Sequence, residues 1–249
     1  MKKSLKKTIK KLLPNFFLRW IKTFLYFKSF INFNTHPHPK KFGYFGENAD
    51  LRLPLKIREM KSVYLYDNTR LNGALELDST NQTLGNKTGK FILKKYSACR
   101  NITVIAFNHK PVVGVPYILT PDMGLDEADD IVVEEDVWIG INVTLIAGAH
   151  IGRGAIVGAC SLVNKDIPPY AVVAGFPAKI VASKFSLEEI IEHEKILYPP
   201  EERLSREFLE KLFENHFREK KSIGKSGLTE EQKDRLNQLK KERNIPIFN

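Results

Sequence analysis

The sequence has 249 residues and a mass of 28.5 kDa, which is enough for about one or two domains with a buried core. Its composition, 43% hydrophobic and 27% charged, excludes collagen-like, mucin-like and membrane-spanning classes and predicts a folded protein. The two cysteines, Cys99 and Cys160, are too few for a disulfide framework and lack zinc-site spacing. We therefore expect a reducing, cytoplasmic environment.

The net charge of +10 comes from the N-terminal part of the chain. Residues 1–46 hold 11 of the 39 Lys and Arg residues and no acidic residue, which leaves 28 basic residues against 29 acidic ones elsewhere. A body without excess charge does not fit a nucleic-acid-binding protein, so we expect no nucleic-acid partner.

Apolar residues in the segment 1–33 recur at helical spacing between lysines, which predicts a basic amphipathic helical arm. Lys10, Lys11, Arg19 and Lys22 interrupt its apolar runs, so the arm fits neither a secretory signal nor a membrane span. Two interpretations remain for it. The arm lies in the plane of an anionic membrane surface, at the inner face of the cell membrane, or it packs on its own domain or a neighbouring subunit.

A six-residue repeat runs from Ile131 to Asp166. Aliphatic residues recur at every sixth position, aliphatic or small residues lie two positions before each of them, and corner-forming residues lie three positions after most of them. The three series are Val133, Ile139, Leu145, Ile151, Val157, Val163; Ile131, Val137, Val143, Ala149, Ala155, Ser161; and Asp136, Asn142, Gly148, Gly154, Cys160, Asp166. A period of six fits no amphipathic helix and predicts short strands joined by corners, stacked coil on coil.

The repeat and the closing GFPAKIV segment resemble the hexapeptide-repeat acyltransferases, and are similar to the galactoside, maltose and xenobiotic acetyltransferases. The resemblance is strongest from Asp136 to Ala182. It implies an all-β core built as a left-handed parallel β-helix with about 18 residues per coil. With the arm and a C-terminal helical tail, the predicted organisation is an arm over 1–46, a β-helix over 47–182 with a loop 110–130 inserted, and a tail over 183–249.

Earlier coils follow the same alternation with gaps, and we expect four coils or slightly more. The pairs Val63/Leu65, Thr69/Leu71 and Leu75/Leu77 form one coil, and a further coil follows as Phe91/Leu93, Ser97/Cys99 and Thr103/Ile105, or with these positions shifted by one residue. The sequence leaves both registers open. Residues 80–90 are rich in Asn, Thr and Gly and predict a corner loop or an irregular coil. In the tail, Ser186/Glu189 and Thr229/Gln232 predict capping boxes at two helix starts.

His109 is the candidate general base, because it stands where the repeat gives way to the inserted loop and the resembled family uses a histidine there to deprotonate the acceptor hydroxyl. A loop histidine bonded to backbone is the structural alternative. Asn108 is a candidate to orient the ring or the acceptor, or is a turn residue.

The resemblance implies acetyl-CoA as the acyl donor, bound along the coil edge by Ile141, Ala159, Asn164, Lys165 and Lys179. Lys165 and Lys179 would attract the phosphates, or are solvated lysines. Ile141 departs from the small polar residue that is common at its position in the resembled family. Ala182 stands where a relative has a second basic residue for the phosphates. Trp138 lines the groove or packs under the tail.

The leading hypothesis is an acetyl-CoA-dependent O-acetyltransferase that modifies a sugar or glycan hydroxyl. The alternatives are N-acetylation of the amino sugar of a nucleotide-sugar, and a non-catalytic β-helix scaffold. The resemblance implies a homotrimer with active sites between neighbouring coils. Related folds hold zinc through three histidines, but the repeat region offers only His109 and His150, so we expect no metal.

Overall fold

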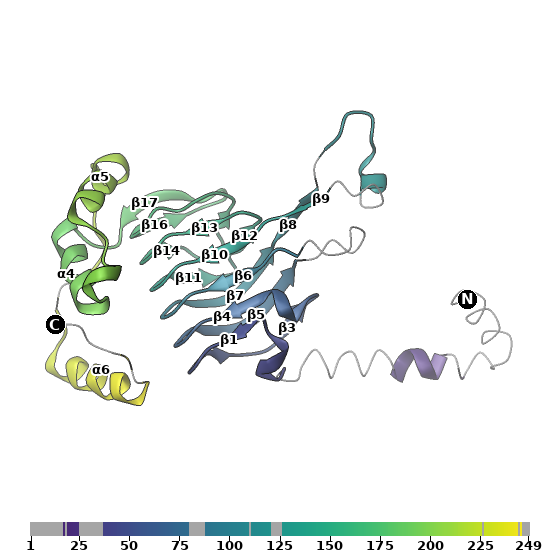
Figure 1. Ribbon diagram of the computed structural model, residues 1–249, viewed down its shortest axis with the longest axis horizontal. Coiled ribbons are helices and arrows are strands. Elements are labelled where there is room, and N and C mark those ends of the chain that lie inside the picture. The colour runs from purple at the N-terminus through teal and green to yellow at the C-terminus, as the bar shows by residue number, and fades with distance from the viewer. Residues whose placement is uncertain are drawn as a thin grey trace.

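The computed structural model describes residues 17, 19–24, 37–79, 88–109, 111–120, 126–225, 227–243 and 245. Most of them form a coil of short, stacked strands with three faces, and the C-terminal helices lie along one side of it (Figure 1). Residues 1–16, 18 and 25–36 of the predicted arm, residues 80–87 of the predicted corner loop over 80–90, and residues 110 and 121–125 of the inserted loop lie outside the described residues. Residues 19–24 are helical.

The first face is a parallel five-stranded sheet, with one strand from each of five coils. It begins three residues before the predicted domain start at residue 47. After the 3₁₀ helix η1 (Pro39–Lys41), its strands in spatial order are β1 (Tyr44–Phe45), β4 (Val63–Leu65), β6 (Phe91–Leu93), β10 (Ile131–Val133) and β13 (His150–Ile151).

The second and third faces form one ten-stranded sheet, because two long strands run around the corner between them. These are β5 (Arg70–Asp78) and β7 (Ala98–Ile105), and their first halves lie on the second face and their second halves on the third. The other strands of the second face are β2 (Asp50–Leu51), β11 (Trp138–Ile141), β14 (Ile156–Val157) and β16 (Ala171–Ala174). Those of the third face are β3 (Leu55–Ile57), β12 (Thr144–Ile146) and β15 (Leu162–Val163). The 3₁₀ helix η2 (Met60–Ser62) follows β3.

Two side chains of each full strand point into the coil. All twelve inward positions predicted from the repeat are buried, from Ile131 and Val133 to Ser161 and Val163, and so are the three pairs predicted for the coil that begins at Val63. Because one branched or small residue stacks on the next along the coil, the interior is a closely packed, mainly apolar column. The six-residue step is therefore confirmed as the repeat of an all-β coil.

The corners carry residues in the left-handed backbone region, as predicted for five of the six repeat corners: Asp136, Asn142, Gly148, Gly154 and Cys160 have φ between 57° and 78°. Asp166 is the exception, since its φ is not positive. We call the turns from the first to the second face the first corner, those from the second to the third face the second corner, and those from the third back to the first face the third corner.

Neither register predicted for residues 91–105 holds throughout. Phe91, Leu93, Ser97 and Cys99 are buried as the first register predicts, but the next inward residues are Ile102 and Val104, and Thr103 and Ile105 point outward. The second corner of this coil is one residue shorter than the others, and Asn101 (φ 47°) occupies it. Its side-chain oxygen accepts a 2.9 Å hydrogen bond from the Ala74 backbone N–H of the preceding coil, which stabilises the shorter turn.

The coil closes with an antiparallel hairpin of β16 and β17 (Lys179–Ser183), after which the chain becomes helical. Both predicted capping boxes are present, at Ser186/Glu189 and Thr229/Gln232. The helical elements are α4 (Leu187–Leu197), η4 (Pro200–Glu202), α5 (Arg206–His216) and α6 (Glu230–Glu242).

Helix α4 and the segment after it pack beside the later coils, where His193 contacts Asp136 and Glu194 contacts Tyr170. Ile190 of α4 and Leu209 and Leu212 of α5 belong to the same buried cluster as the coil interior. In contrast, α6 buries no residue, and the Arg243 carbonyl at its C-terminal end accepts a 3.2 Å hydrogen bond from the Asn48 side chain of the first coil. The tail therefore runs along the first-corner side of the coil, from Tyr170 in the last coil to Asn48 in the first.

Candidate active site

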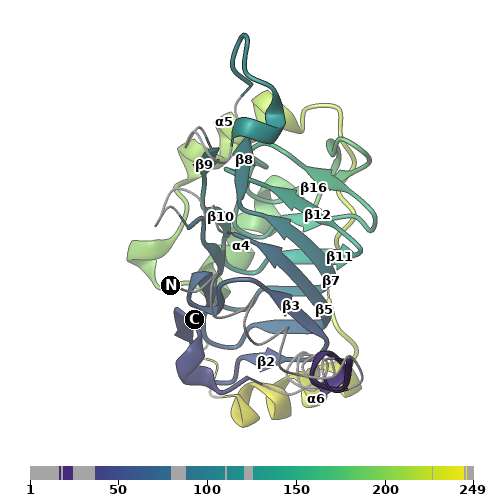
Figure 2. The ribbon, with the colours of Figure 1, turned by 90° about the vertical axis from the view of Figure 1, so that its right-hand side faces the viewer.

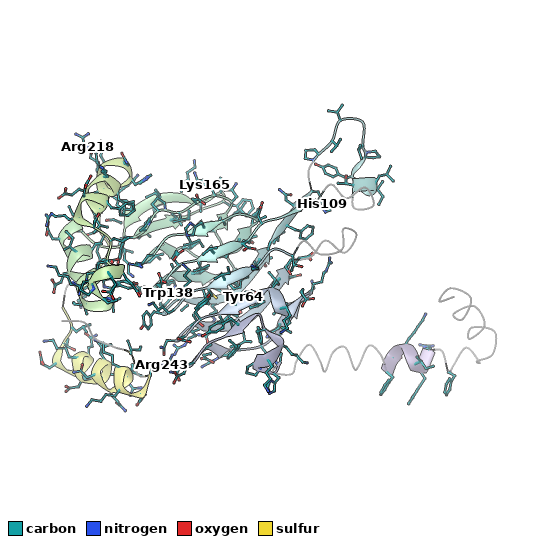
Figure 3. All side chains as sticks on the ribbon, viewed as in Figure 1. Tyr64, His109, Trp138, Lys165, Arg218 and Arg243 are labelled. Atoms are coloured by element: carbon teal, nitrogen blue, oxygen red, sulfur yellow. The ribbon has the colours of Figure 1, made fainter. Side chains whose placement is uncertain are left out.

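His109 ends β8 (Phe107–His109), the strand by which the chain leaves the third corner of the middle coil. β8 pairs in antiparallel fashion with β9 (Asp126–Ala128), on which the chain returns, and His109 lies opposite Asp126. The imidazole is half-buried and meets the Phe107 ring edge-on, with 5.5 Å between ring centroids. The predicted base thus stands on a strand pair at the side of the coil, as Figure 3 shows.

Asn108 is exposed, and its side-chain oxygen accepts a 3.0 Å hydrogen bond from the His109 backbone N–H. This contact fixes the Asn108 amide against the backbone of its neighbour. It matches the turn-residue interpretation of Asn108 more closely than a role in orienting the imidazole.

The loop between β8 and β9 projects away from the coil (Figures 1 and 2). Several of its apolar side chains are exposed. A tight turn places Gly114 at φ 79°, and the Val115 N–H donates to the Val112 carbonyl at 3.0 Å. Val113 at this turn is fully exposed, and Ile118 of the 3₁₀ helix η3 (Tyr117–Leu119) is 82% exposed. Monomeric proteins rarely expose such a group of aliphatic residues without a partner surface.

Ile141 and Ala159 lie next to each other at the second corner, in successive coils. The Cys160 N–H donates to the Ile141 carbonyl at 2.9 Å, and Ala159 and Cys160 are both exposed. Gly140 lies directly under Ala159, because a Cβ at Gly140 would come within 2.7 Å of the Ala159 nitrogen. This close approach leaves a shallow backbone-lined edge with one exposed aliphatic side chain, which is the kind of surface an extended pantetheine arm can follow.

The two predicted phosphate-binding lysines are both exposed and lie near the end of the coil. Asn164 and Lys165 follow β15 at the third corner, and Lys179 begins β17, opposite Ala174. The two strand segments are joined by backbone bonds, since the Ala178 N–H donates to the Leu162 carbonyl at 2.8 Å.

Trp138 lies on the outer side of the second face, where 65% of its surface is exposed. It pairs with Ala98 and Ile156 along the face and is not covered by the tail, and Figure 3 places it well away from Lys165. The interpretation that Trp138 packs under the tail is therefore wrong. Trp138 remains a candidate for the outer wall of the groove.

Within one chain, the candidate base does not meet the candidate groove, by which we mean the second-corner edge formed by Ile141 and Ala159. Ile141 and Ala159 are at the second corner and His109 leaves the third corner, so at least the width of the third face separates them. Three residues of strand span about 10 Å. A complete site from these residues therefore needs the base of one chain beside the groove of another.

No group of three or more His, Cys, Asp or Glu side chains in the described part of the chain lies close enough together to hold a metal ion. No helix in this same part is long and apolar enough to cross a membrane.

Residues 130–165 match the family model described as bacterial transferase hexapeptide (six repeats). A "Putative lipopolysaccharide biosynthesis O-acetyl transferase" of Escherichia coli is 32% identical over 139 residues, which cover 55% of this chain and 69% of that protein. A chloramphenicol acetyltransferase of Escherichia coli is 48% identical over 63 residues, but these cover only 25% of this chain and 30% of that enzyme.

Among solved structures, a hexapeptide-repeat containing acetyltransferase from Vibrio cholerae superposes with a TM-score of 0.50 and 23% identity, over 61% of this chain and 85% of that one. The same protein has also been solved in complex with acetyl coenzyme A. Fold, repeat and sequence similarity agree, and the chain belongs to the hexapeptide-repeat transferase family, whose coil is a left-handed parallel β-helix.

Proposed function

We propose that this protein is an acetyl-CoA-dependent O-acetyltransferase that acetylates a hydroxyl group of a sugar or glycan, with His109 as the general base. One observation carries the proposal: a histidine stands on the strand by which the chain leaves a hexapeptide coil, beside a projecting loop. Similarity to a protein named for lipopolysaccharide O-acetylation, over 69% of its length, supports a glycan acceptor.

In the proposed reaction, His109 accepts the proton of the acceptor hydroxyl while the oxygen attacks the acetyl carbonyl carbon of the thioester. The carbon–sulfur bond then breaks, the acetyl group stays on the acceptor oxygen as an ester, and His109 returns the proton to the leaving sulfur. Asn108 holds the backbone on which the imidazole is mounted. Ile141 and Ala159 provide the edge for the pantetheine arm, Asn164, Lys165 and Lys179 provide the polar end for the phosphates, and Trp138 provides an outer wall.

The active protein is a homotrimer in this proposal, because His109 and the edge formed by Ile141 and Ala159 lie at opposite edges of the third face. The exposed Val113 and Ile118 support such an assembly, since a neighbouring coil would cover them. The loop of one subunit would then bring His109 to the Lys165 edge of the next.

The arm, residues 1–33, contacts an anionic membrane surface in this proposal and keeps the enzyme at the inner face of the cell membrane. In the described turn of helix, Trp20 and Phe24 are exposed and stack on one another, with ring centroids 6.1 Å apart. Arg19 and Lys22 accompany them, and exposed aromatic rings beside basic residues suit an interfacial helix.

Thermal unfolding of the full chain with and without acetyl-CoA tests the donor. A ligand that binds the folded state alone raises Tm with increasing concentration, and at a concentration 100 times its Kd it adds about 2.7 kcal/mol of stability. An unchanged Tm at millimolar acetyl-CoA would favour a scaffold over an enzyme. Product analysis then distinguishes an ester from an amide. An amide product on an amino sugar would show that the activity is N-acetylation and not O-acetylation.

A further inference from the structure

Phe176, to which the sequence pattern assigns no role, is a large apolar side chain that the fold holds in solvent. It is the second residue of the turn between β16 and β17, and 76% of its surface is exposed. Gly175 before it adopts φ 103°, and Ala178 after it is buried.

The turn is fixed to the last coil on both sides of Phe176. The Leu162 N–H donates to the Gly175 carbonyl at 3.1 Å, and the Ala178 N–H donates to the Leu162 carbonyl at 2.8 Å. In addition, the Gly175 N–H donates to the hydroxyl oxygen of buried Ser161 at 3.2 Å. The backbone that carries the ring is therefore well anchored, although the ring itself has few contacts.

The ring stands at the end of the second corner, in line with the candidate groove. The coils place Ile141, then Ala159 and Cys160, then the Gly175 turn at successive positions along this corner, as the pairing of β11 with β14 and of β14 with β16 shows. An extended ligand bound along the second corner past Ala159 would next contact Phe176.

Two lysines and few acidic residues lie in this part of the coil. Lys179 is three residues after Phe176, and Lys165 is three residues after Leu162, which bonds to both sides of the turn; both lysines are exposed. From residue 154 to residue 187 the chain contains a single acidic residue, Asp166. An exposed aromatic ring, with Lys179 three residues away and Lys165 across the third face, suits a ligand that carries both a flat base and phosphate groups.

We propose that Phe176 is the stacking platform for the adenine base of the donor, and thereby selects a donor that carries an adenine nucleotide. The inference rests on the proposed function and deepens it, since it assigns recognition of the base to one residue beyond those expected to hold the pantetheine arm and the phosphates. Stacking a base on an aromatic side chain is strong enough for its loss to weaken binding about tenfold.

Calorimetric titration of the full chain with three probes tests the inference. The probes are coenzyme A, adenosine 3′,5′-bisphosphate, which has the base and phosphates without the arm, and pantetheine, which has the arm alone. We expect Phe176→Ala to raise Kd about tenfold for the first two probes and to leave pantetheine binding unchanged, whereas Phe176→Trp keeps all three affinities. Phe208→Ala, a change at a partly exposed phenylalanine of α5, is the matched control and should alter none of them.

The outcomes separate this inference from the proposed function. Wild-type protein that does not bind coenzyme A contradicts the proposed function itself. Wild-type protein that binds it, with Phe176→Ala binding coenzyme A and the bisphosphate equally well, overturns the stacking role alone. A change of oligomeric state in Phe176→Ala, measured by sedimentation, would instead make Phe176 a subunit contact and also overturn it.

Discussion

The hydroxyl of Tyr170 donates a 2.6 Å hydrogen bond to Glu194 Oε1, which joins the first corner of the last coil to the first helix of the tail. Both side chains are buried, and Arg153 and the Leu204 N–H contact the other oxygen, Oε2, at 3.1 and 3.0 Å. Burial and the adjacent Glu194 raise the pKa of Tyr170, so its hydroxyl stays protonated and acts as the donor. The bond therefore connects the tail to the coil that carries the candidate groove.

We expect Tyr170→Phe to lower the free energy of unfolding by about 2 kcal/mol, because it removes a hydrogen bond to a buried charged group. Tyr198→Phe is the matched control. The Tyr198 hydroxyl is buried and has no hydrogen-bond partner among the described residues, so its removal should change stability by less than about 0.5 kcal/mol. Urea unfolding followed by circular dichroism measures both, and equal losses in the two variants would contradict the role of the Tyr170 bond.

Acid should destabilise the protein through Asp136, at the first corner. Burial alone would raise the pKa of Asp136, but hydrogen bonds with His193 and Lys184, at 3.0 and 2.5 Å, hold this pKa below its ordinary value. A carboxylate with a lowered folded-state pKa contributes stability that is fully present above the unfolded pKa of about 3.9 and is lost as the pH falls through the folded pKa.

The matching variant is Asp136→Asn, because asparagine tolerates the left-handed φ of 57° at this corner. We expect this variant to be less stable than the wild type at pH 7 and to lose less stability than the wild type below about pH 4. Urea unfolding at a series of pH values measures the difference. Parallel pH curves for the two proteins would exclude Asp136 as a source of the acid sensitivity.

The two lysines near the end of the coil, Lys165 and Lys179, should contribute to binding of the donor and not of the acceptor. We expect Lys165→Ala and Lys179→Ala each to raise KM for acetyl-CoA about tenfold, since each removes a charge that would face phosphate, with little change in kcat. Lys221→Ala, at an exposed lysine outside the candidate site, is the control. Added salt should raise the KM of the wild type for acetyl-CoA by a larger factor than that of either variant. An unchanged KM in both variants would make Lys165 and Lys179 ordinary solvated residues.

A shared site between subunits predicts complementation. Mixed trimers formed by refolding His109→Ala with the inactive double variant Lys165→Glu/Lys179→Glu should recover about one quarter of wild-type activity, since one site in four then combines an intact base with an intact groove. No recovered activity in confirmed mixed trimers would place base and groove in the same subunit.

The projecting loop should contribute to assembly of the trimer. We expect Val113→Asp in this loop to weaken the trimer, as measured by sedimentation.

The interior of the coil could be predicted from the sequence because each inward position is occupied by an aliphatic or small residue at a constant step. The register after Cys99 could not, since it depends on the Asn101 side chain bonding to Ala74, a contact 27 residues away in the chain. His109 was predicted through the resemblance, but the distance between His109 and Ile141 within one chain follows only from the way the faces turn. Likewise, nothing in the GFPAKIV segment indicates that the fold would leave Phe176 exposed while burying Ala178.

The most direct test of the central claim is the rate at which free thiol is released from acetyl-CoA in the presence of saccharide acceptors, compared between the wild type and His109→Ala. General-base catalysis predicts that the variant still binds acetyl-CoA but loses about 100- to 10,000-fold in kcat. Wild-type turnover that His109→Ala retains in full would contradict the assignment of His109 as the base.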